Sequence, residues 1–209
     1  MALGLSGAVR GVYRLHLLLL RLSRLTCWIV NSCLTGRAPC GRLTSPIYLR
    51  LKGGYGDGQS PIAVVIDLYS RRVVGWSVRP TLAKELATSA LKNAIEHQRP
   101  RAGLIHHSDR GSQYTSYEYQ RMLRREGITI SMSRSGSCHD NAPTESFFGT
   151  LKTEMHLRGD PFNSHSEAKR GLFEYIEVFY NRQRRHSTLG YQTPMEFEQH
   201  YINRQTTAA

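Results

Sequence analysis

The chain has 209 residues, which is enough for one domain of ordinary size with a buried core. Hydrophobic residues make up 40% of the chain, a share that excludes wholesale disorder. Its 28 Lys and Arg outnumber 16 Asp and Glu, and the net charge is +12. Such a charge predicts a polyanionic partner, with nucleic acid first and an anionic membrane surface second. A charge that serves only solubility is the alternative.

The cysteines predict neither a zinc site nor a disulfide framework. Cys27, Cys33, Cys40 and Cys138 form no CxxC pair, and spacings of six and seven do not suit zinc ligands. We expect free thiols in a reducing, cytoplasmic compartment. The strongly apolar run at 17–20 is too short to span a bilayer, so no membrane partner is expected.

The start of the chain differs from the rest. Residues 1–60 hold eight Lys or Arg and one acid, Asp57, and residues 1–45 show no clear period. We expect 1–45 to be an atypical basic segment, either disordered or translated from a shifted reading frame. A folded core at 46–199 and a tail at 200–209 complete the expected organisation.

Regular structure is expected from residue 47 onward. Residues 47–51 predict a short first strand, and a Gly-rich turn follows at 53–58. The nearly continuous apolar run at 62–68 predicts a central strand buried on both faces, and 73–78 completes a hairpin with it. A helix with one apolar face is expected to begin at Thr81.

The second half of the chain alternates strands and helices. Strands are predicted at 103–107 and 128–133, and helices at 116–126, 143–157, 166–183 and after Thr193. The inward face of the long helix is predicted to hold Leu172, Phe173, Ile176, Phe179 and Tyr180. This order of elements predicts an α/β fold with a mixed five-stranded sheet flanked by helices, which is the arrangement of ribonuclease H-like folds.

Two carboxylates occupy positions where chemistry is expected. Asp109 follows a short apolar strand, and ligand sites of open α/β sheets form at the carboxyl ends of strands. Glu145 lies in the first turn of the helix after Pro143. Converging carboxylates bind the divalent cations that phosphoryl transfer on DNA requires. The alternatives are a loop acid that caps the turn at Gly111 and a first-turn acid favoured by the helix dipole.

Longer motifs decide between these interpretations. The chain contains AVVIDLYSRRVVGW (63–76), HHSDRGSQY (106–114), DNAPTESFFGTLK (140–152) and YNRQRRHSTLGY (180–191). Together they closely resemble the integrase-type, Asp–Asp–Glu catalytic core of bacterial insertion-sequence transposases, in the group whose second reading frame encodes this domain. Thirty-five residues separate Asp109 from Glu145, which is the family's spacing between its second and third acids.

The resemblance assigns expected roles. Asp109 and Glu145 match the second and third metal-binding acids, so Mg²⁺ or Mn²⁺ in a two-metal site is implied. Lys152 shares a helix face with Glu145 and matches a basic residue that contacts phosphate. Further DNA contacts are expected at Asn141, Arg182, Arg184, Arg185 and His186. The alternatives are a helix cap for Asn141 and dipole complements for the C-terminal cations.

The match fails at the family's first Asp. Alignment on Tyr48 places Ser45 there, and no acid precedes Asp57 in the chain. Asp67 is a weak substitute, because its family counterpart is structural. The chain is therefore expected to be either an active transposase core that cleaves and joins DNA or a catalytically inactive, DNA-binding remnant. A hybrid-specific nuclease on the same fold is a third alternative.

Two further expectations concern neighbours and partners. Of the strand-end pair His106 and His107, one is expected to be buried and one exposed. By resemblance, end recognition requires a helix-turn-helix from a separate first-frame protein or a fused N-terminal region. A homo-oligomer on paired DNA ends, in the bacterial cytoplasm at the nucleoid, is also implied.

Overall fold

The structure is a computed structural model. It describes the backbone of residues 27–32, 48–50, 59–79, 85–132, 142–156 and 162–207. Side chains are described for residues 61–79, 85–132, 143–155 and 162–204. The expected Gly-rich turn at 53–58, the first residues of the helix expected from Thr81 and the loop at 135–141 lie outside the described residues.

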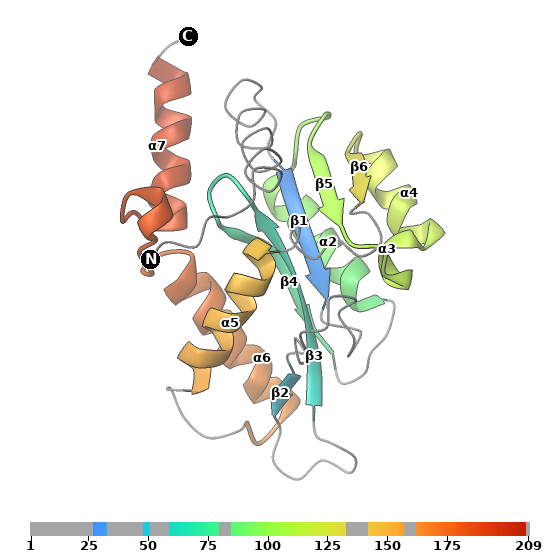
Figure 1. The fold of residues 1–209 in the computed structure, drawn as a ribbon, viewed down its shortest axis with the longest axis vertical. Helices are drawn as coiled ribbons and strands as arrows, with labels where there is room; N and C mark the ends of the chain where they lie inside the picture. Colours follow the sequence, from blue (N-terminus) through green and yellow to red (C-terminus); the bar gives the residue numbers. More distant parts are fainter. Residues whose placement is uncertain are drawn as a thin grey trace, which may run out of the picture.

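A mixed sheet with helices on both sides forms the centre of the molecule (Figure 1). Its six strands are β1 (Cys27–Ser32), β2 (Tyr48–Arg50), β3 (Gln59–Asp67), β4 (Val73–Val78), β5 (Ile105–Ser108) and β6 (Thr129–Met132). Antiparallel pairs join β4 to β3 and β3 to β1, and parallel pairs join β1 to β5 and β5 to β6. The mixed sheet that the sequence predicted is confirmed, and within the described residues it has six strands where five were expected.

The first strand of the sheet differs from the expected one. The sequence predicted it at 47–51, but β2 at that place only forms a short antiparallel pair with the start of β3. The strand between β3 and β5 is β1, which comes from the segment 1–45. The short strand predicted at 47–51 is thus present as β2, whereas β1 was not predicted, because its place in the sheet depends on pairing with two strands that lie far along the chain.

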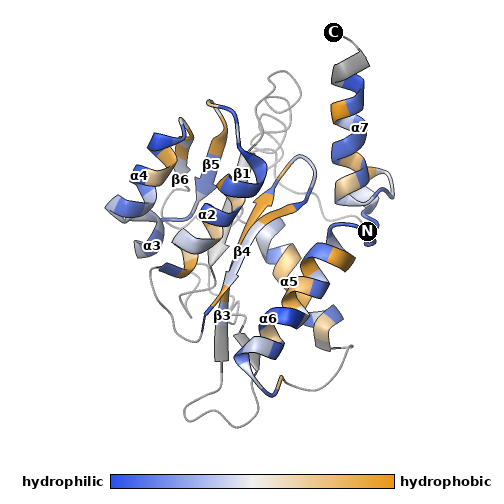
Figure 2. Ribbon diagram, turned by 180° about the vertical axis from the view of Figure 1, so that it is seen from behind, coloured by the Kyte–Doolittle hydropathy of each residue, from blue (hydrophilic) through white to orange (hydrophobic). Residues whose placement is uncertain are grey.

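The helices divide between the two faces of the sheet because alternate residues of β3 point to opposite sides. Ala63 and Val65 pack with α2 (Glu85–Gln98) and α4 (Tyr117–Arg125). Val64 and Ile66 pack with the helices that follow β6. Figure 2 shows hydrophobic residues concentrated on β4 and hydrophilic residues along α4 and α7. The core therefore lies in two layers, one on each side of β3.

The long helix expected at 166–183 is divided into two parts. The α-helix α6 (His165–Phe173) continues as the π-helix η2 (Glu174–Tyr180). The buried stripe runs through Leu172, Tyr175, Ile176 and Tyr180. Phe173, predicted to face inward, is 53% exposed because it lies about 100° around the helix from Leu172.

The C-terminal helix α7 (Pro194–Thr207) is longer than predicted and includes most of the expected tail at 200–209. Its Phe197 and Tyr201 pack against Tyr69, which lies in the turn between β3 and β4, at ring distances of 5.2 and 5.0 Å. None of the helices in the described ranges has the length and apolarity needed to cross a lipid bilayer.

Candidate active site

Asp109 directly follows the last residue of β5, at the carboxyl end of that strand. Its carboxylate is partly buried, and its Oδ1 accepts a hydrogen bond from the backbone N–H of Gly111 at 2.8 Å. Burial raises the pKa of Asp109, and the Gly111 hydrogen bond opposes the shift. Among the described residues, no hydrogen bond engages Oδ2. Asp109 thus combines the turn-capping role that was the alternative with one carboxylate oxygen left for a ligand.

The two histidines before Asp109 are both buried, which corrects the expectation that one would be exposed. His106 Nε2 lies 2.9 Å from the Tyr119 hydroxyl, and burial lowers the pKa of His106 to about 3. His107 Nδ1 lies 2.9 Å from Ser131 Oγ on β6. β5 lies between β1 and β6 with helices over the sheet, so both side chains fill the interior and stabilise the end of β5.

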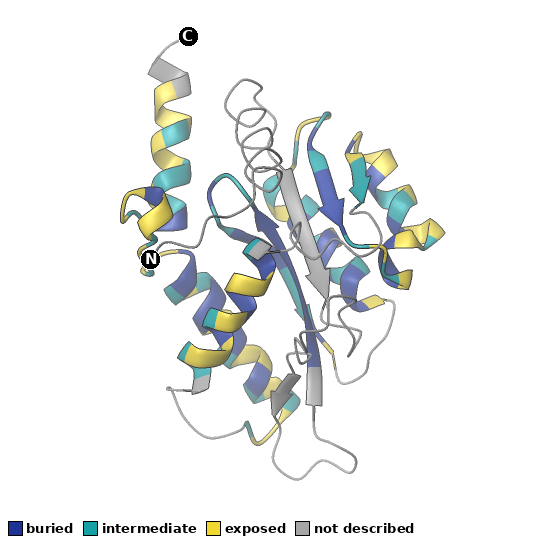
Figure 3. Ribbon diagram, in the orientation of Figure 1, coloured by how far each residue is buried: buried dark blue, intermediate teal, exposed yellow. Residues whose placement is uncertain are grey.

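Glu145 and Lys152 lie on α5 (Ala142–His156), and both are exposed. The opposite face of this helix is buried through Phe147, Phe148 and Leu151. Figure 3 shows this division, with dark blue residues toward the sheet and yellow residues outward. The buried face fixes how α5 lies on the sheet, and thereby keeps Glu145 and Lys152 on the outer side.

The elements that carry Asp109 and Glu145 meet at β1. β5 pairs with β1 along one edge, and α5 contacts β1 on the face of the sheet that it covers. Figure 1 shows the N-terminal end of α5 beside β1, with the arrowhead of β5 on the other side of the strand. The fold thus brings the strand before Asp109 and the helix that carries Glu145 to one strand.

Two hydroxyl groups at this place have no hydrogen-bond partner within the described part of the chain. They are the Oγ of Ser108, the residue before Asp109, and the Oγ1 of Thr144, the residue before Glu145. Both side chains are buried. The described residues contain no group of three or more His, Cys, Asp or Glu placed to hold a metal ion.

The strand register shows which residue of β1 stands level with Asp109. Ser45 lies outside the described residues. Val30 of β1 pairs with Ser108 of β5, so Asn31 is the residue of β1 that stands level with Asp109. On its other side Asn31 pairs with Val64, which packs in the same cluster as Phe148 of α5. Position 31 therefore lies beside the end of β5, on the strand that α5 also contacts.

Asp67 lies elsewhere. It pairs with Trp28, which is three residues before Asn31 and so roughly 10 Å away along the strand. Its Oδ2 accepts hydrogen bonds from the Ser70 hydroxyl at 2.5 Å and the Ser70 N–H at 3.0 Å. Burial raises the pKa of Asp67, and these hydrogen bonds oppose the shift. Asp67 therefore stabilises the hairpin turn between β3 and β4.

The predicted DNA contacts fall into three groups. Asn141 lies outside the described residues, and Arg182 and Arg185 are exposed near the end of η2. Arg184 forms an ion pair with Glu154 of α5, with its Nε 3.0 Å from Oε1. His186 is half-buried, and burial together with the nearby Arg184 lowers its pKa to about 4. The side chains of Arg182 and Arg185 are thus more accessible to a ligand than that of Arg184.

Two residues that hold elements of the fold together were not identified from the sequence. Asn181 is buried and pairs with the backbone of Val73. Glu154 ties α5 to the C-terminal region through Tyr175 and Arg184. Asn181 stands in the YNRQRRH motif, which marks it as a candidate, whereas nothing in the sequence around Glu154 separates it from a surface acid.

A sheet in the order β4-β3-β1-β5-β6, with acids after β5 and on the helix that contacts β1, has the ribonuclease H-like architecture of integrase catalytic cores. The family described as "Integrase core domain" matches residues 42–138, and a second family of the same description matches residues 126–194. Together the two matches cover residues 42–194, and the chain belongs to the integrase core domain family.

Curated relatives carry insertion-sequence names. The chain is 49% identical over 147 residues to the insertion element IS600 uncharacterized 31 kDa protein of Shigella sonnei, a match that covers 69% of this chain and 53% of that protein. It is 45% identical over 142 residues to transposase InsF for insertion sequence IS3A of Escherichia coli, which covers 68% of this chain and 49% of InsF. The chain thus spans about half the length of these relatives.

Among solved structures, the HTLV-2 integrase catalytic core domain in complex with magnesium has the same fold. The likeness covers 83% of this chain and 97% of that one, with a TM-score of 0.53 and 17% identity. The ribonuclease H-like fold predicted from the sequence is therefore confirmed.

Proposed function

We propose that this chain is the catalytic core of an insertion-sequence transposase, which cleaves phosphodiester bonds of DNA and joins the ends to a target. One observation carries the proposal: Asp109 directly follows β5, and Glu145 lies on the helix that contacts β1, the neighbour of β5. Water or a DNA 3′-hydroxyl is the nucleophile of the in-line displacement.

The donors at this place suit a hard divalent cation, Mg²⁺ or Mn²⁺. Carboxylate oxygens are the ligands that these ions prefer, and Asp109 keeps Oδ2 free of hydrogen bonds to the described residues. When bound, such a cation stabilises the charge that develops on the attacking and leaving oxygens. Asp109 and Glu145 would hold such a cation.

The basic residues hold and orient the DNA. Lys152 stands two helical turns after Glu145 on the same exposed side of α5, where its ammonium group can contact a phosphate near the acids. Arg182 and Arg185 supply further phosphate contacts, and Asn141 precedes the helix that carries Glu145. These contacts are largely independent of DNA sequence, because they address the backbone.

A second candidate function is DNA binding without cleavage, and the register of β1 favours it. Position 31, level with Asp109, holds an asparagine, and asparagine offers a neutral amide oxygen in place of a carboxylate. The two-metal arrangement implied by the resemblance needs a third carboxylate. We therefore expect cleavage by the natural chain to be slow and to respond to the residue at position 31.

Cleavage of DNA by purified chains in Mn²⁺ tests both candidates. Asn31→Asp should raise the rate by on the order of a hundredfold, since a metal-bound carboxylate contributes several kcal/mol to the transition state. Ser45→Asp, the change that alignment on Tyr48 suggests, should leave it unchanged. Adding Asp109→Asn to Asn31→Asp should abolish cleavage. If Ser45→Asp alone raised the rate, the register of β1 would not mark the site. If no variant cleaved, DNA binding alone would remain.

The partners of the whole protein follow from the resemblance. We propose that a helix-turn-helix, from a first-frame protein or a fused N-terminal region, selects the element ends, and that copies of this chain assemble on paired ends. The reaction takes place on DNA in the bacterial cytoplasm. Gel-shift assays with and without an added helix-turn-helix module test whether this core alone distinguishes element ends from other DNA.

A further inference from the structure

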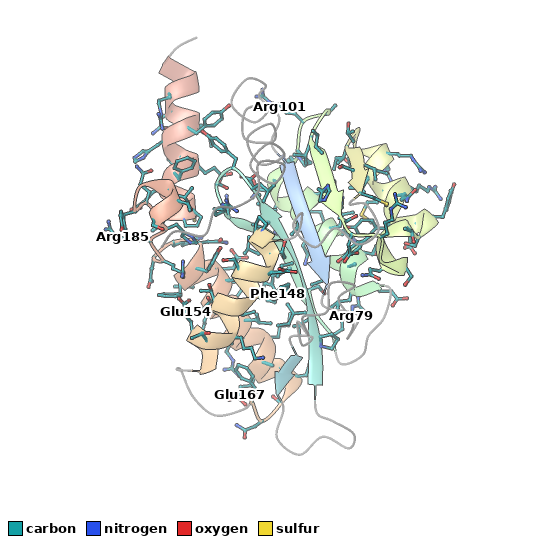
Figure 4. All side chains as sticks on the ribbon, viewed as in Figure 1. Arg79, Arg101, Phe148, Glu154, Glu167 and Arg185 are labelled. Carbon is teal, nitrogen blue, oxygen red and sulfur yellow. The ribbon has the colours of Figure 1, made fainter. Side chains whose placement is uncertain are left out.

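The carboxylate of Glu154, in the last turns of α5, has both oxygens occupied. Its Oε2 accepts a hydrogen bond from the Tyr175 hydroxyl at 2.6 Å, and its Oε1 lies 3.0 Å from Nε of Arg184. Glu154 and Arg184 are each about one-quarter exposed, so the pair is shielded from water more than a surface pair is. Figure 4 shows Phe148 between α5 and the sheet and Glu154 on the side of α5 that faces the C-terminal helices.

The guanidinium group of Arg184 has further neighbours that fix its direction. Its Cζ lies 5.8 Å from the ring centre of Tyr180, and one terminal nitrogen lies 3.5 Å from His186 Nε2. Tyr180 in turn contacts Phe147 of α5, with ring centres 4.9 Å apart and planes at 88°. An arginine held by a carboxylate, an aromatic face and an imidazole is directed into the protein and away from a DNA backbone.

α5 is therefore tied to η2 at two points. The first is the contact between Phe147 and Tyr180, close to Glu145 in the chain, and the second is the polar contact of Glu154 with Tyr175 and Arg184. Two ties nearly two helical turns apart fix both the rotation and the tilt of a helix. Rotation of α5 about its axis would move Glu145 and Lys152 relative to Asp109.

We propose that Arg184 and Tyr175, acting through Glu154, are positioning residues that hold the helix carrying Glu145 and Lys152, and that Arg184 is not a DNA contact. The inference rests on the proposed function for the part that concerns Glu145. It predicts that removing either partner of the ion pair loosens α5 and slows cleavage, while the affinity for DNA and its dependence on salt stay the same.

The test uses the full chain with Glu154→Gln, Arg184→Gln and the double variant, and Arg185→Gln as the exposed control. Three quantities are measured: hydrogen exchange of the α5 amides, the salt dependence of DNA binding, and the rate of DNA cleavage. For the cleavage assay, each substitution is combined with Asn31→Asp. Each single change should raise α5 exchange about tenfold and lower kcat about tenfold at unchanged KM. The double variant should be no worse than either single variant, because both remove one interaction.

Arg184→Lys should recover part of the kcat, because an ammonium group keeps the charge. The inference is overturned if Arg184→Gln lowers the salt dependence as Arg185→Gln does while α5 exchange stays at its natural rate. If no variant cleaves DNA, the proposed function fails, but exchange and salt dependence still decide the role of Arg184. Additive effects of the two single changes would also overturn it.

Discussion

The side-chain amide of Asn181 pairs with both backbone groups of Val73, across 108 residues of chain. Its Oδ1 accepts a hydrogen bond from the Val73 N–H, and its Nδ2 donates one to the Val73 carbonyl, both at 3.0 Å. The amide thus takes the place of a neighbouring strand at the start of β4. The Asn181 carbonyl also accepts a hydrogen bond from the N–H of Met195 at 3.0 Å. One buried residue therefore joins the sheet, the end of η2 and α7.

Replacing Asn181 with alanine should lower the free energy of unfolding by about 2–4 kcal/mol, because it leaves a buried N–H and a buried carbonyl of Val73 unpaired. Urea unfolding measures the change. Gln183→Ala, at an exposed position two residues later, should change the free energy by less than about 0.5 kcal/mol. Equal effects of the two substitutions would show that the hydrogen bonds between Asn181 and Val73 do not stabilise the fold.

Two glycines should respond to alanine with opposite signs. A Cβ at Gly75 on β4 would overlap the carbonyl oxygen of Ala90 and lie 2.7 Å from the Cβ of Ala94 on α2, so Gly75→Ala should destabilise the fold by about 1–3 kcal/mol. A Cβ at Gly149 on α5 meets no atom within 4 Å, so Gly149→Ala should stabilise it by about 0.5–1 kcal/mol. Thermal unfolding of both variants checks the signs, and a stabilising Gly75→Ala would contradict the packing of α2 on the sheet.

Acid should destabilise the protein through His106. Burial lowers the pKa of His106 from 6.5 to about 3, so the unfolded chain binds a proton on this imidazole more readily than the folded chain does. The stability is present above pH 6.5 and is lost as the pH falls toward 3. Between pH 7.5 and 5.5 this group should remove about 1.4 kcal/mol from the free energy of unfolding. His186 acts in the same direction.

The double variant His106→Phe with Tyr119→Phe removes both partners of the buried hydrogen bond, so it leaves neither group unpaired. Between pH 7.5 and 5.5, the free energy of unfolding of this double variant should fall by about 1.4 kcal/mol less than that of the natural chain. His97→Gln is the control: it removes an exposed imidazole on α2 and shows how such a loss alone changes the pH dependence of unfolding. An unchanged slope in the double variant would mean that His106 is not the group responsible.

DNA affinity should depend on where a positive charge is removed. Arg185→Gln and Lys152→Gln should each lower the slope of log affinity against log salt by about one, because each removes one phosphate contact. Lys92→Gln removes the same charge from α2, which covers the opposite face of the sheet and pairs Lys92 with Glu96 at 3.7 Å. It should leave the slope unchanged. A slope that falls equally in all three would indicate that net charge alone binds DNA.

The sequence alone predicted those elements whose formation depends on residues close together in the chain. The apolar run at 62–68 and the residues at 73–78 predicted the β3–β4 hairpin, and Asp109 and Glu145 were placed at the end of a strand and in the first turn of a helix, where the structure has them. These predictions depend only on burial along a strand and on helix start signals.

What depends on distant pairing was not predictable from the sequence. β1 has six residues in a segment without a period, and its place follows from hydrogen bonds to β3 and β5. The ion pair of Glu154 and Arg184 joins residues 30 positions apart, so the local pattern near Arg184 did not indicate it. The π-helix η2 was also missed, since its apolar stripe resembles that of an α-helix.

Binding of Mn²⁺ to the natural chain and to Asp109→Asn, measured by isothermal titration calorimetry, tests most directly whether Asp109 and Glu145 form one cation site. We expect Asp109→Asn and Glu145→Gln each to weaken binding by about tenfold or more, while Asp67→Asn, in the hairpin turn, leaves it unchanged. Asn31→Asp should tighten it. Equal affinity of the natural chain and Asp109→Asn for Mn²⁺ would contradict the site proposed at the end of β5.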